Sequence, residues 1–556
     1  MRRQHLLIFD TIVLGVVGAL GARLFMYLLH LAQSLFLTYL AGYTLPALGP
    51  DGTVTGQVIG SHGLWLIPVV TTLGGLISGI LVYGIAPEAE GHGTDAVVRA
   101  FHRSAGRIRA RVTPLKIVAS AITIGSGGSA GREGPTALFS AGVGSIYADL
   151  FHRTDHERRL LVLVGMAAGL SAIFRSPIGT AIFAVEVLYG AMQFEAGALI
   201  YTMLGSIVAY AVNGYFVGWA PLFQVPAGLQ TPGLAEYAWY IALGLGGGVV
   251  GTLLPNAFYG LRDAFHRIPI PPHVKPAIGG LGVGLIALAL PQVLGGGYGW
   301  IQQAIDGRLT LALLGVLIFA KLIAFSLTVS SGGSGGVFAP SLFVGAMVGG
   351  FLAQLVHQPP AAFAVVGMAA VFGSAARIPV ATLLMVTEMT GGYTLLVPAA
   401  LAVTLAFLVQ ERLSARLKYR SLYEAQVSQP SDSPAHKVEH LKTALKMLQE
   451  RGTSIDTDRI EHVNLMALLE SGIPIDLPDG KRLVTGRLKP DSPCAGKPLK
   501  QGCLIQEAVD WEIVAIFRQD HLIVPHPSSV LKAEDRLLVL LPIEFEDELR
   551  EHLETG

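Results

Sequence analysis

Long apolar stretches recur along the first 410 residues of the chain, and few charged positions lie within them. Several stretches reach the length of about 20 residues that a helix needs to cross a bilayer, and Gly, Ser and Pro interrupt others. The pattern predicts an all-α polytopic membrane domain whose helices differ in length, some of them ending inside the membrane. The clearest stretches are residues 7–45, 64–85, 197–217, 236–255 and 393–410.

The pattern changes near residue 480, where short apolar runs alternate with polar positions as in β-strands. We expect a small α/β soluble domain over residues 480–556 and a membrane domain over residues 1–425. Residues 426–479 then form a linker and helical connector. The strand-like runs are LVTGRL, EIVAIFRQDHLIVP and DRLLVLLP, and the connector contains LKTALKMLQERG.

The membrane domain contains an internal repeat. Residues 116–145 align without gaps on residues 321–350, with 12 of 30 positions identical, and residues 164–187 align on residues 366–389. Chance similarity of apolar segments does not explain Gly, Pro, Arg and Glu positions that match in register. We therefore expect two inverted repeats, at about 1–225 and 230–425. In membrane transporters such repeats often enclose the substrate site between interrupted helices.

Composition supports a bilayer environment. Only 14% of the residues are charged and 52% are hydrophobic, and 36 of the 78 charged residues fall within residues 433–556. The formal net charge of zero gives no basic surface for nucleic acid.

The arginines indicate topology. Arg2 and Arg3 precede the first apolar stretch, and four more arginines lie within residues 103–111. Both positions are expected on the cytoplasmic side of a prokaryotic inner membrane, and so is the C-terminal domain. Its cysteines, Cys494 and Cys503, are expected to be reduced.

Two glycine-rich segments occupy matching positions in the repeats, Gly131–Pro135 and Gly336–Pro340. A small anion in hydrocarbon needs a substitute for its water, and helix N-termini supply free N–H groups and a fractional positive charge. Glycine permits close approach of the backbone, and proline fits a first helical turn. The segments are candidate anion ligands, although small residues also serve close helix packing.

These segments resemble the CLC family of chloride channels and proton/chloride exchangers. The family pattern GREGP stands at residues 131–135, and the pattern GxFxP stands at residues 336–340. The segment GLSAIFRSPIGTAIFAVEV at residues 169–187, which comes after GREGP, also resembles the family. Tyr423 in SLYEAQ resembles the tyrosine that ends the family's membrane domain. The resemblance covers roughly residues 10–425.

The resemblance implies that Glu133 is a gate whose carboxylate occupies the outer anion position and leaves it when protonated or displaced. An ionisable residue within membrane sequence is itself a functional candidate. The backbone amides of Gly134, Val337 and Phe338 become candidate chloride ligands, and the Tyr423 hydroxyl a donor on the inner side. Tyr419 lies close to Tyr423 and is an alternative to it, while either tyrosine could also be an interfacial anchor.

The chain departs from the family at two places. Gly91-His92-Gly93-Thr94-Asp95 stands where the family has GSGIP, so His92 replaces the anion-contacting serine and Gly93 keeps the glycine frame. His92 could donate an N–H to the anion, titrate, or only cap a helix.

The second departure concerns protons. Exchangers of this family commonly carry a proton-accepting glutamate directly after another glutamate, and here the pair is Glu186-Val187. Val187 cannot carry a proton, which leaves Glu186 as a weak candidate and favours a passive channel. A proton-coupled exchanger remains the alternative, because some exchangers also lack this carboxylate.

The C-terminal segment resembles the RCK-C or TrkA-C regulatory type in DSPCAGKPLK, VAIFRQDHLIVPHPSSVL and the acidic turn at Asp535. It implies assembly or the binding of a small ligand. A regulated cation transporter is a distant alternative, and an intramembrane enzyme is disfavoured because no nucleophile–base pair or HExxH metal motif is present. We expect no cofactor or metal, and a homodimer with one pore in each subunit.

Overall fold

The computed structural model describes residues 2–49, 54–61, 63–226, 233–439, 474–477, 480–499, 511–518 and 521–554. The chain divides into two compact units. The membrane unit comprises Met1–Ala100 and Gly106–Gln426, and the tail unit comprises Phe101–Ala105 and Val427–Gly556. The predicted connector LKTALKMLQERG and Cys503 lie outside the described residues.

The first repeat is a series of helices of very different lengths, as the sequence predicts. The apolar stretch at 7–45 forms α1, continues as a π-helical segment over Ser34–Leu40 and ends before a short hairpin of β1 (Tyr43–Thr44) and β2 (Val58–Ile59). The α-helices are α1 (Arg2–Gln33), α2 (Ile67–Ile85), α3 (Thr94–Arg103), α4 (Val112–Gly125), α5 (Glu133–Leu150), α6 (Asp155–Phe174), α7 (Pro177–Glu186) and α8 (Ala196–Val217).

The second repeat presents the same order of long and short helices. Its first helix, α9, runs well beyond the predicted stretch of 236–255 and contains Pro255. The α-helices are α9 (Tyr237–Arg267), α10 (Lys275–Ala289), α11 (Tyr298–Ile305), α12 (Leu311–Ser330), α13 (Phe338–Leu355), α14 (Pro360–Ala375), α15 (Pro379–Thr390) and α16 (Leu396–Ser414).

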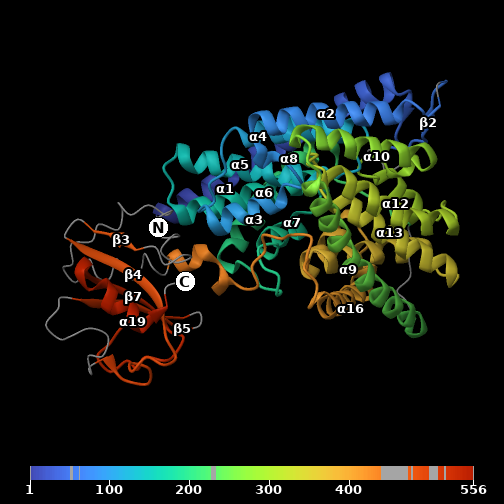
Figure 1. Ribbon diagram of the computed structural model, residues 1–556. Coiled ribbons are helices and arrows are strands. Elements are labelled where there is room, and N and C mark those ends of the chain that lie inside the picture. The colour runs from blue at the N-terminus through green and yellow to red at the C-terminus, as the bar shows by residue number, and fades with distance from the viewer. Residues whose placement is uncertain are drawn as a thin grey trace. The chain divides into compact units, whose positions relative to one another are not determined.

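Equivalent helices pack in equivalent ways. Helix α5 packs on α6 as α13 packs on α14, and α1 packs on α8 as α9 packs on α16. The two repeats meet where equivalent helices face each other, α2 against α10 (Figure 1) and α7 against α15. The internal repeat predicted from the sequence is therefore present in the fold.

Backbone conformations repeat as well. Arg175 and Arg377 both adopt the left-handed region, with φ of 56° and 57°, directly after α6 and shortly after α14. His152 and His357 do the same after α5 and α13, with φ of 51° and 55°. Non-glycine residues rarely adopt this conformation, so matched examples show that both repeats impose the same turns.

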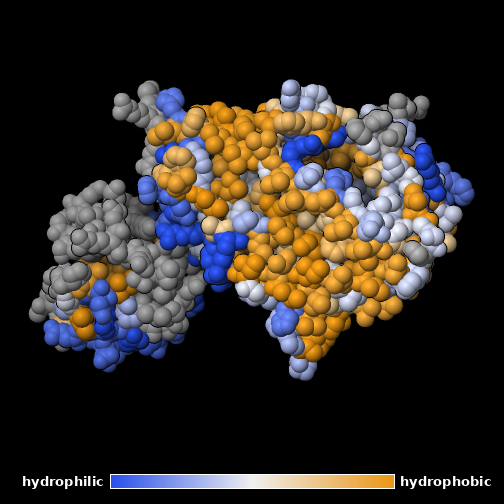
Figure 2. All heavy atoms as spheres, turned by 90° about the horizontal axis from the view of Figure 1, so that it is seen from above, coloured by the Kyte–Doolittle hydropathy of each residue, from blue (hydrophilic) through white to orange (hydrophobic). Residues whose placement is uncertain are grey.

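Large apolar side chains cover most of the visible face of the membrane unit (Figure 2). Among the described residues, eight helices are long and apolar enough to cross a bilayer. Exposed side chains on different helices, such as Tyr27, Ile200 and Val397, need an apolar solvent. The membrane unit is therefore a multi-pass membrane domain, as predicted.

The tail unit contains an antiparallel sheet with the strand order β3-β4-β7-β5-β6, and β8 also pairs with β4. Buried Val484, Ile516 and Val539 pack with Leu549 of α19, and Cys494 joins this core. The run EIVAIFRQDHLIVP forms two strands. The elements are β3 (Ile475–Asp476), β4 (Lys481–Leu488), β5 (Glu512–Arg518), β6 (His521–Ile523), β7 (Arg536–Pro542), α19 (Glu546–His552) and β8 (Leu553–Glu554).

The acidic turn of the tail closes on an ion pair. The Arg518 guanidinium donates to both carboxylate oxygens of Asp535 at 2.8 Å, and the Lys532 amide donates to the same carboxylate at 2.7 Å. The hydrogen bond from Arg518 to Asp535 raises the pKa of Arg518 above its ordinary value. The turn thus links β5 to the start of β7.

Candidate functional site

The two glycine-rich segments and the segment at residues 91–95 meet inside the membrane unit. Gly131 and Gly336 exchange two backbone hydrogen bonds of 2.7 Å, which join the segments that lead into α5 and α13. The Gly335 amide donates to the Gly91 carbonyl at 3.2 Å, which adds the segment that leads into α3. The N-termini of the three helices are thereby tied together, as an anion site built from helix N-termini requires.

Glycine is needed where these segments cross. A Cβ atom on Gly134 would lie 1.7 Å from the His92 carbonyl oxygen. A Cβ atom on Gly93, whose φ is +85°, would lie 2.5 Å from the Gly134 carbonyl oxygen. These distances are far below van der Waals contact, so no side chain fits at either position without displacement of the backbone.

Glu133 is the first residue of α5, and it is only 2% exposed. Its carboxylate accepts a hydrogen bond from the Tyr298 hydroxyl and one from the Ala339 amide, at 3.4 Å, in the first turn of α13. The carboxylate therefore sits where the N-terminus of α13 would hold an anion.

Tyr298 was missed by the sequence analysis. It begins α11 after Gly295 and Gly297, whose φ values of 57° and 80° match 68° and 85° at Gly91 and Gly93. Tyr298 is thus the counterpart of Thr94 in the other repeat. Extension of the repeat from residue 116 back to the glycine frame at residues 91–93 would have pointed to this position.

The inner candidates gather around aromatic rings. The Tyr423 ring is 5.6 Å from the His92 ring and 6.4 Å from the Phe183 ring, and Tyr423 is 2% exposed. Phe183 contacts Phe338 at the start of α13. Val337 and Phe338 are both buried. Phe183 contacts both Tyr423 and Phe338, so Tyr423 lies close to the N-terminus of α13.

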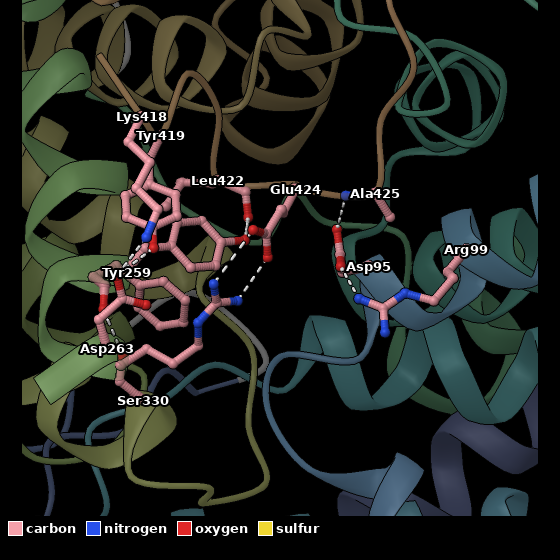
Figure 3. A network of polar contacts seen from close by, with 12 residues as sticks. Asp95, Arg99, Tyr259, Asp263, Ser330, Lys418, Tyr419, Leu422, Glu424 and Ala425 are labelled. Carbon is pink, nitrogen blue, oxygen red and sulfur yellow. Dashed lines mark hydrogen bonds and ion pairs between the residues drawn. The ribbon is translucent and has the colours of Figure 1, made fainter. Parts of the chain in front are cut away.

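Tyr419 is engaged elsewhere. Its hydroxyl donates to Asp263 at 2.6 Å, and its ring stacks on Tyr259 at 4.8 Å (Figure 3). Lys418 donates to the same carboxylate at 2.7 Å. Of the two tyrosines that the sequence offered, Tyr423 is the one beside the helix N-termini.

Polar contacts hold the segment that carries Tyr423 on both sides (Figure 3). The Tyr259 hydroxyl donates to the Leu422 carbonyl at 2.8 Å, and Arg262 pairs with Glu424 at 2.7 Å. The Ala425 amide donates to Asp95 at 2.7 Å. Asp95, which stands in place of the family's proline, thus joins the first turn of α3 to the Tyr423 segment.

His92 presents an unusual polar group. Its side chain is 7% exposed, and its ring lies between Tyr423 and Phe258. Within the described residues, its buried Nδ1 has no hydrogen-bond partner. Buried polar groups are nearly always satisfied, so this nitrogen is available to an ion or water.

Buried lysines support the loops that precede α3 and α11. Lys116 donates to the carbonyls of Ala89 and Gly91, at 2.8 and 2.7 Å. Its repeat counterpart, Lys321, donates to the carbonyls of Val293 and Gly295, at 2.7 and 2.6 Å. Each lysine points its ammonium toward backbone carbonyl oxygens and fixes the loop that precedes a helix N-terminus.

The two glutamates matched by the repeat cap each other's helices. Glu186 accepts from the amides of Val380 and Ala381, at 3.2 and 2.6 Å, at the start of α15. Glu388 accepts from Ser176 and from the amide of Gly179, at 2.5 and 2.8 Å, at the start of α7. Val187 is fully buried, and its carbonyl accepts from Gln426 at 3.1 Å.

No group of three His, Cys, Asp or Glu residues lies close enough to hold a metal ion in the part of the chain that the structure describes. The groups predicted to face the ions are backbone amides, the Tyr298 and Tyr423 hydroxyls, the His92 imidazole and the Glu133 carboxylate. This set suits an anion and a proton, because amides and hydroxyls donate to anions while the carboxylate accepts a proton.

Comparison with protein families identifies two parts of the chain. Residues 74–411 match the family described as voltage gated chloride channel, and residues 483–554 match the TrkA-C domain. The second match agrees with the regulatory domain predicted for the tail.

Two curated relatives are each 30% identical to this chain. An H(+)/Cl(-) exchange transporter from Cronobacter sakazakii is 30% identical over 374 residues, which are 65% of this chain and 79% of the relative. A chloride channel protein named as ClcB-like, from Ralstonia nicotianae, is 30% identical over 353 residues, 61% of this chain and 81% of the relative.

Solved structures share the fold. A slow cyanobacterial Cl-/H+ antiporter has a TM-score of 0.65 at 22% identity, with 75% of this chain and 96% of that chain covered. A CLC-type fluoride/proton antiporter has a TM-score of 0.64 at 22% identity, with 76% and 98% covered. Since the family match alone spans more than half of the residues, the chain belongs to the voltage gated chloride channel family, CLC, and carries a TrkA-C domain after its membrane domain.

Proposed function

We propose that this protein exchanges chloride for protons across the membrane, with Glu133 as the group that both ions use. The observation that carries the proposal is the position of the Glu133 carboxylate, buried at the N-terminus of α13 and bonded to Tyr298 and Ala339. Relatives named H(+)/Cl(-) exchange transporters support exchange over the passive channel that Val187 favoured in the sequence.

Competition for one helix N-terminus gives the coupling. A charged carboxylate and a chloride ion repel each other, and both gain from the same N–H groups. Protonation removes the charge of Glu133 and weakens its hold on Ala339, so chloride can take its place. When chloride leaves, the carboxylate can return only after it releases its proton.

The inner ligand set belongs to the same proposal. The amides of Gly134, Val337 and Phe338 and the Tyr423 hydroxyl supply partial positive charge from several directions. Such a set binds chloride favourably yet allows it to leave, unlike a fixed cation at contact distance. His92 and Gly93 complete the set, with the His92 imidazole donating where the family has a serine hydroxyl.

Protons need a route that avoids Val187 and Glu186. Val187 has no titratable group, and both oxygens of Glu186 are occupied by amides of α15. We propose that water carries protons past the Tyr423 segment to Glu133, while Glu186 acts as a helix cap.

The membrane domain is proposed to work as a homodimer with one pathway in each subunit. The tail is proposed to lie in the cytoplasm and to regulate transport through assembly or a small ligand. Both proposals follow family resemblance and the positions of the arginines.

The test is coupled flux in liposomes. A chloride gradient is imposed without a proton gradient, and chloride and pH are recorded in the same vesicles. Exchange predicts uphill proton movement with a fixed ratio to chloride. Chloride flux that dissipates with no proton movement would show a passive channel instead.

A further inference from the structure

A cavity of about 650 Å³ lies on one side of the gate. The second half of α1, the residues that follow it and the first residue of α11 form much of its lining. Arg23, His30, Arg132 and Arg175 all line it, and no Asp or Glu occurs among the lining residues that the structure describes. Tyr298, which bonds to Glu133, is part of the same wall.

The three arginines are held without carboxylate partners in the described part of the chain. Arg132 donates to the Ile173 carbonyl at 3.5 Å and lies over the Tyr298 ring at 4.4 Å. Arg175 donates to the Ala220 carbonyl at 2.7 Å. Arg23 lies over the Phe216 ring at 5.9 Å.

Two further features of the cluster suit a bound anion. The Nε atom of Arg132 is buried and has no hydrogen-bond partner among the described residues. Arg23, Arg132 and Arg175 line one cavity, so their positive charges act on the same volume. Glu133 attracts Arg132, but the Glu133 oxygens are bonded to Tyr298 and Ala339.

We propose that this cavity binds a multivalent oxyanion, such as sulfate or phosphate, which acts on transport from outside the gate. Planar guanidinium groups match the oxygens of such anions and can bind them through paired N–H donors. The cavity is far larger than one chloride ion, and three full charges would hold a permeant ion too firmly for rapid passage. The effect on flux rests on the proposed function, whereas binding does not.

The cavity is expected on the periplasmic side. Helix α1 starts at Arg2, which is expected in the cytoplasm, and the cavity is lined by the later half of α1, from Ala22 onward. Two sources could supply an oxyanion with the same charged oxygens, namely a free anion from the periplasm and the phosphate of an anionic lipid. The flux test below distinguishes between them.

The binding test uses titration calorimetry on the full-length protein in a neutral detergent, with sulfate as titrant at constant ionic strength. We expect saturable binding that weakens by about tenfold in Arg175→Gln and in Arg23→Gln, since each loses a charge-assisted contact. Arg308→Gln is the matched control, because Arg308 is exposed and does not line the cavity. Equal affinity in all four proteins, or no binding to the wild type, would overturn the proposal.

The flux test compares two kinds of liposome. In phosphatidylcholine alone, external sulfate should slow chloride flux in the wild type and in Arg308→Gln, and less in Arg175→Gln. If the occupant is a lipid phosphate, phosphatidylglycerol should slow flux and abolish the sulfate effect. If sulfate inhibits Arg175→Gln as strongly as the wild type, the effect arises from surface charge only, which would contradict the proposal. If only proton coupling fails, the binding result is unaffected.

Discussion

Glu133 is held by donors from two helices of the opposite repeat, the Tyr298 hydroxyl of α11 and the Ala339 amide of α13. The sequence pointed to Glu133 and Gly134 as candidates because both lie within one contiguous motif. It left out Tyr298, which lies 165 positions away from Glu133 and which only an extension of the repeat to the glycine frame at residues 91–93 would have indicated. A contact between a side chain and a distant loop leaves no local signal.

Loss of the Tyr298 hydroxyl should loosen the gate. In Tyr298→Phe the carboxylate loses one of two donors that stabilise its charged form, so less acid should be needed to free it. We expect chloride flux at pH 7 to rise several-fold while the ratio of protons to chloride stays unchanged. Flux measured from pH 5 to 8 checks this, with exposed Tyr393→Phe as the control. An unaltered pH profile would contradict the role of Tyr298.

Contacts of single side chains explain the unusual residues at positions 92 and 95, where the family has serine and proline. Asp95 accepts from the Ala425 amide, a contact that a proline side chain could not make. His92 replaces a short hydroxyl by a ring that packs on Tyr423. The sequence showed that both positions were unusual, but only their distant neighbours show what each side chain does.

At the scale of elements, the repeat was the strongest sequence signal, and it gave the architecture. Matched Glu186 and Glu388 were visible in the alignment, yet their exchange of helix caps was not. Glu186 caps α15 and Glu388 caps α7, so each repeat completes a helix of the other. This reciprocity depends on how the repeats face each other, which a linear alignment does not contain.

Substitution of these caps should affect stability and leave coupling intact. Glu186→Gln and Glu388→Gln each weaken charge-assisted contacts with helix amides, which we expect to cost about 1 kcal/mol. Thermal unfolding in detergent should show a loss for each variant, because each carboxylate accepts from two amides of the opposite helix. The proton-to-chloride ratio should stay at the wild-type value. A ratio that collapses in Glu186→Gln alone would place Glu186 on the proton pathway.

At the scale of the whole molecule, composition separated a membrane domain from a charged tail. The tail unit also includes Phe101–Ala105 of the membrane sequence. His102 there lies 2.7 Å from the Ser433 hydroxyl, and both residues are buried. No local pattern indicates this link, since it joins residues 331 positions apart.

Truncation at two points should separate structure from regulation. A chain that ends after Glu439 keeps Ser433 and should retain chloride flux while it loses any response mediated by the TrkA-C domain. A chain that ends after Pro430 leaves His102 without Ser433 and should be less stable. Flux and thermal unfolding of the two chains check this. Complete loss of flux after truncation at Glu439, in a folded protein, would contradict the proposed division of labour.

The central claim is that one carboxylate serves both ions. Glu133→Gln removes the charge that competes with chloride and the group that carries the proton, while it keeps the shape of the side chain. The direct measurement is chloride and proton flux in the same liposomes under a chloride gradient, for the wild type and for Glu133→Gln. We predict that the variant keeps chloride flux and loses both proton movement and pH dependence. Proton movement that persists at the wild-type ratio in Glu133→Gln would contradict the account.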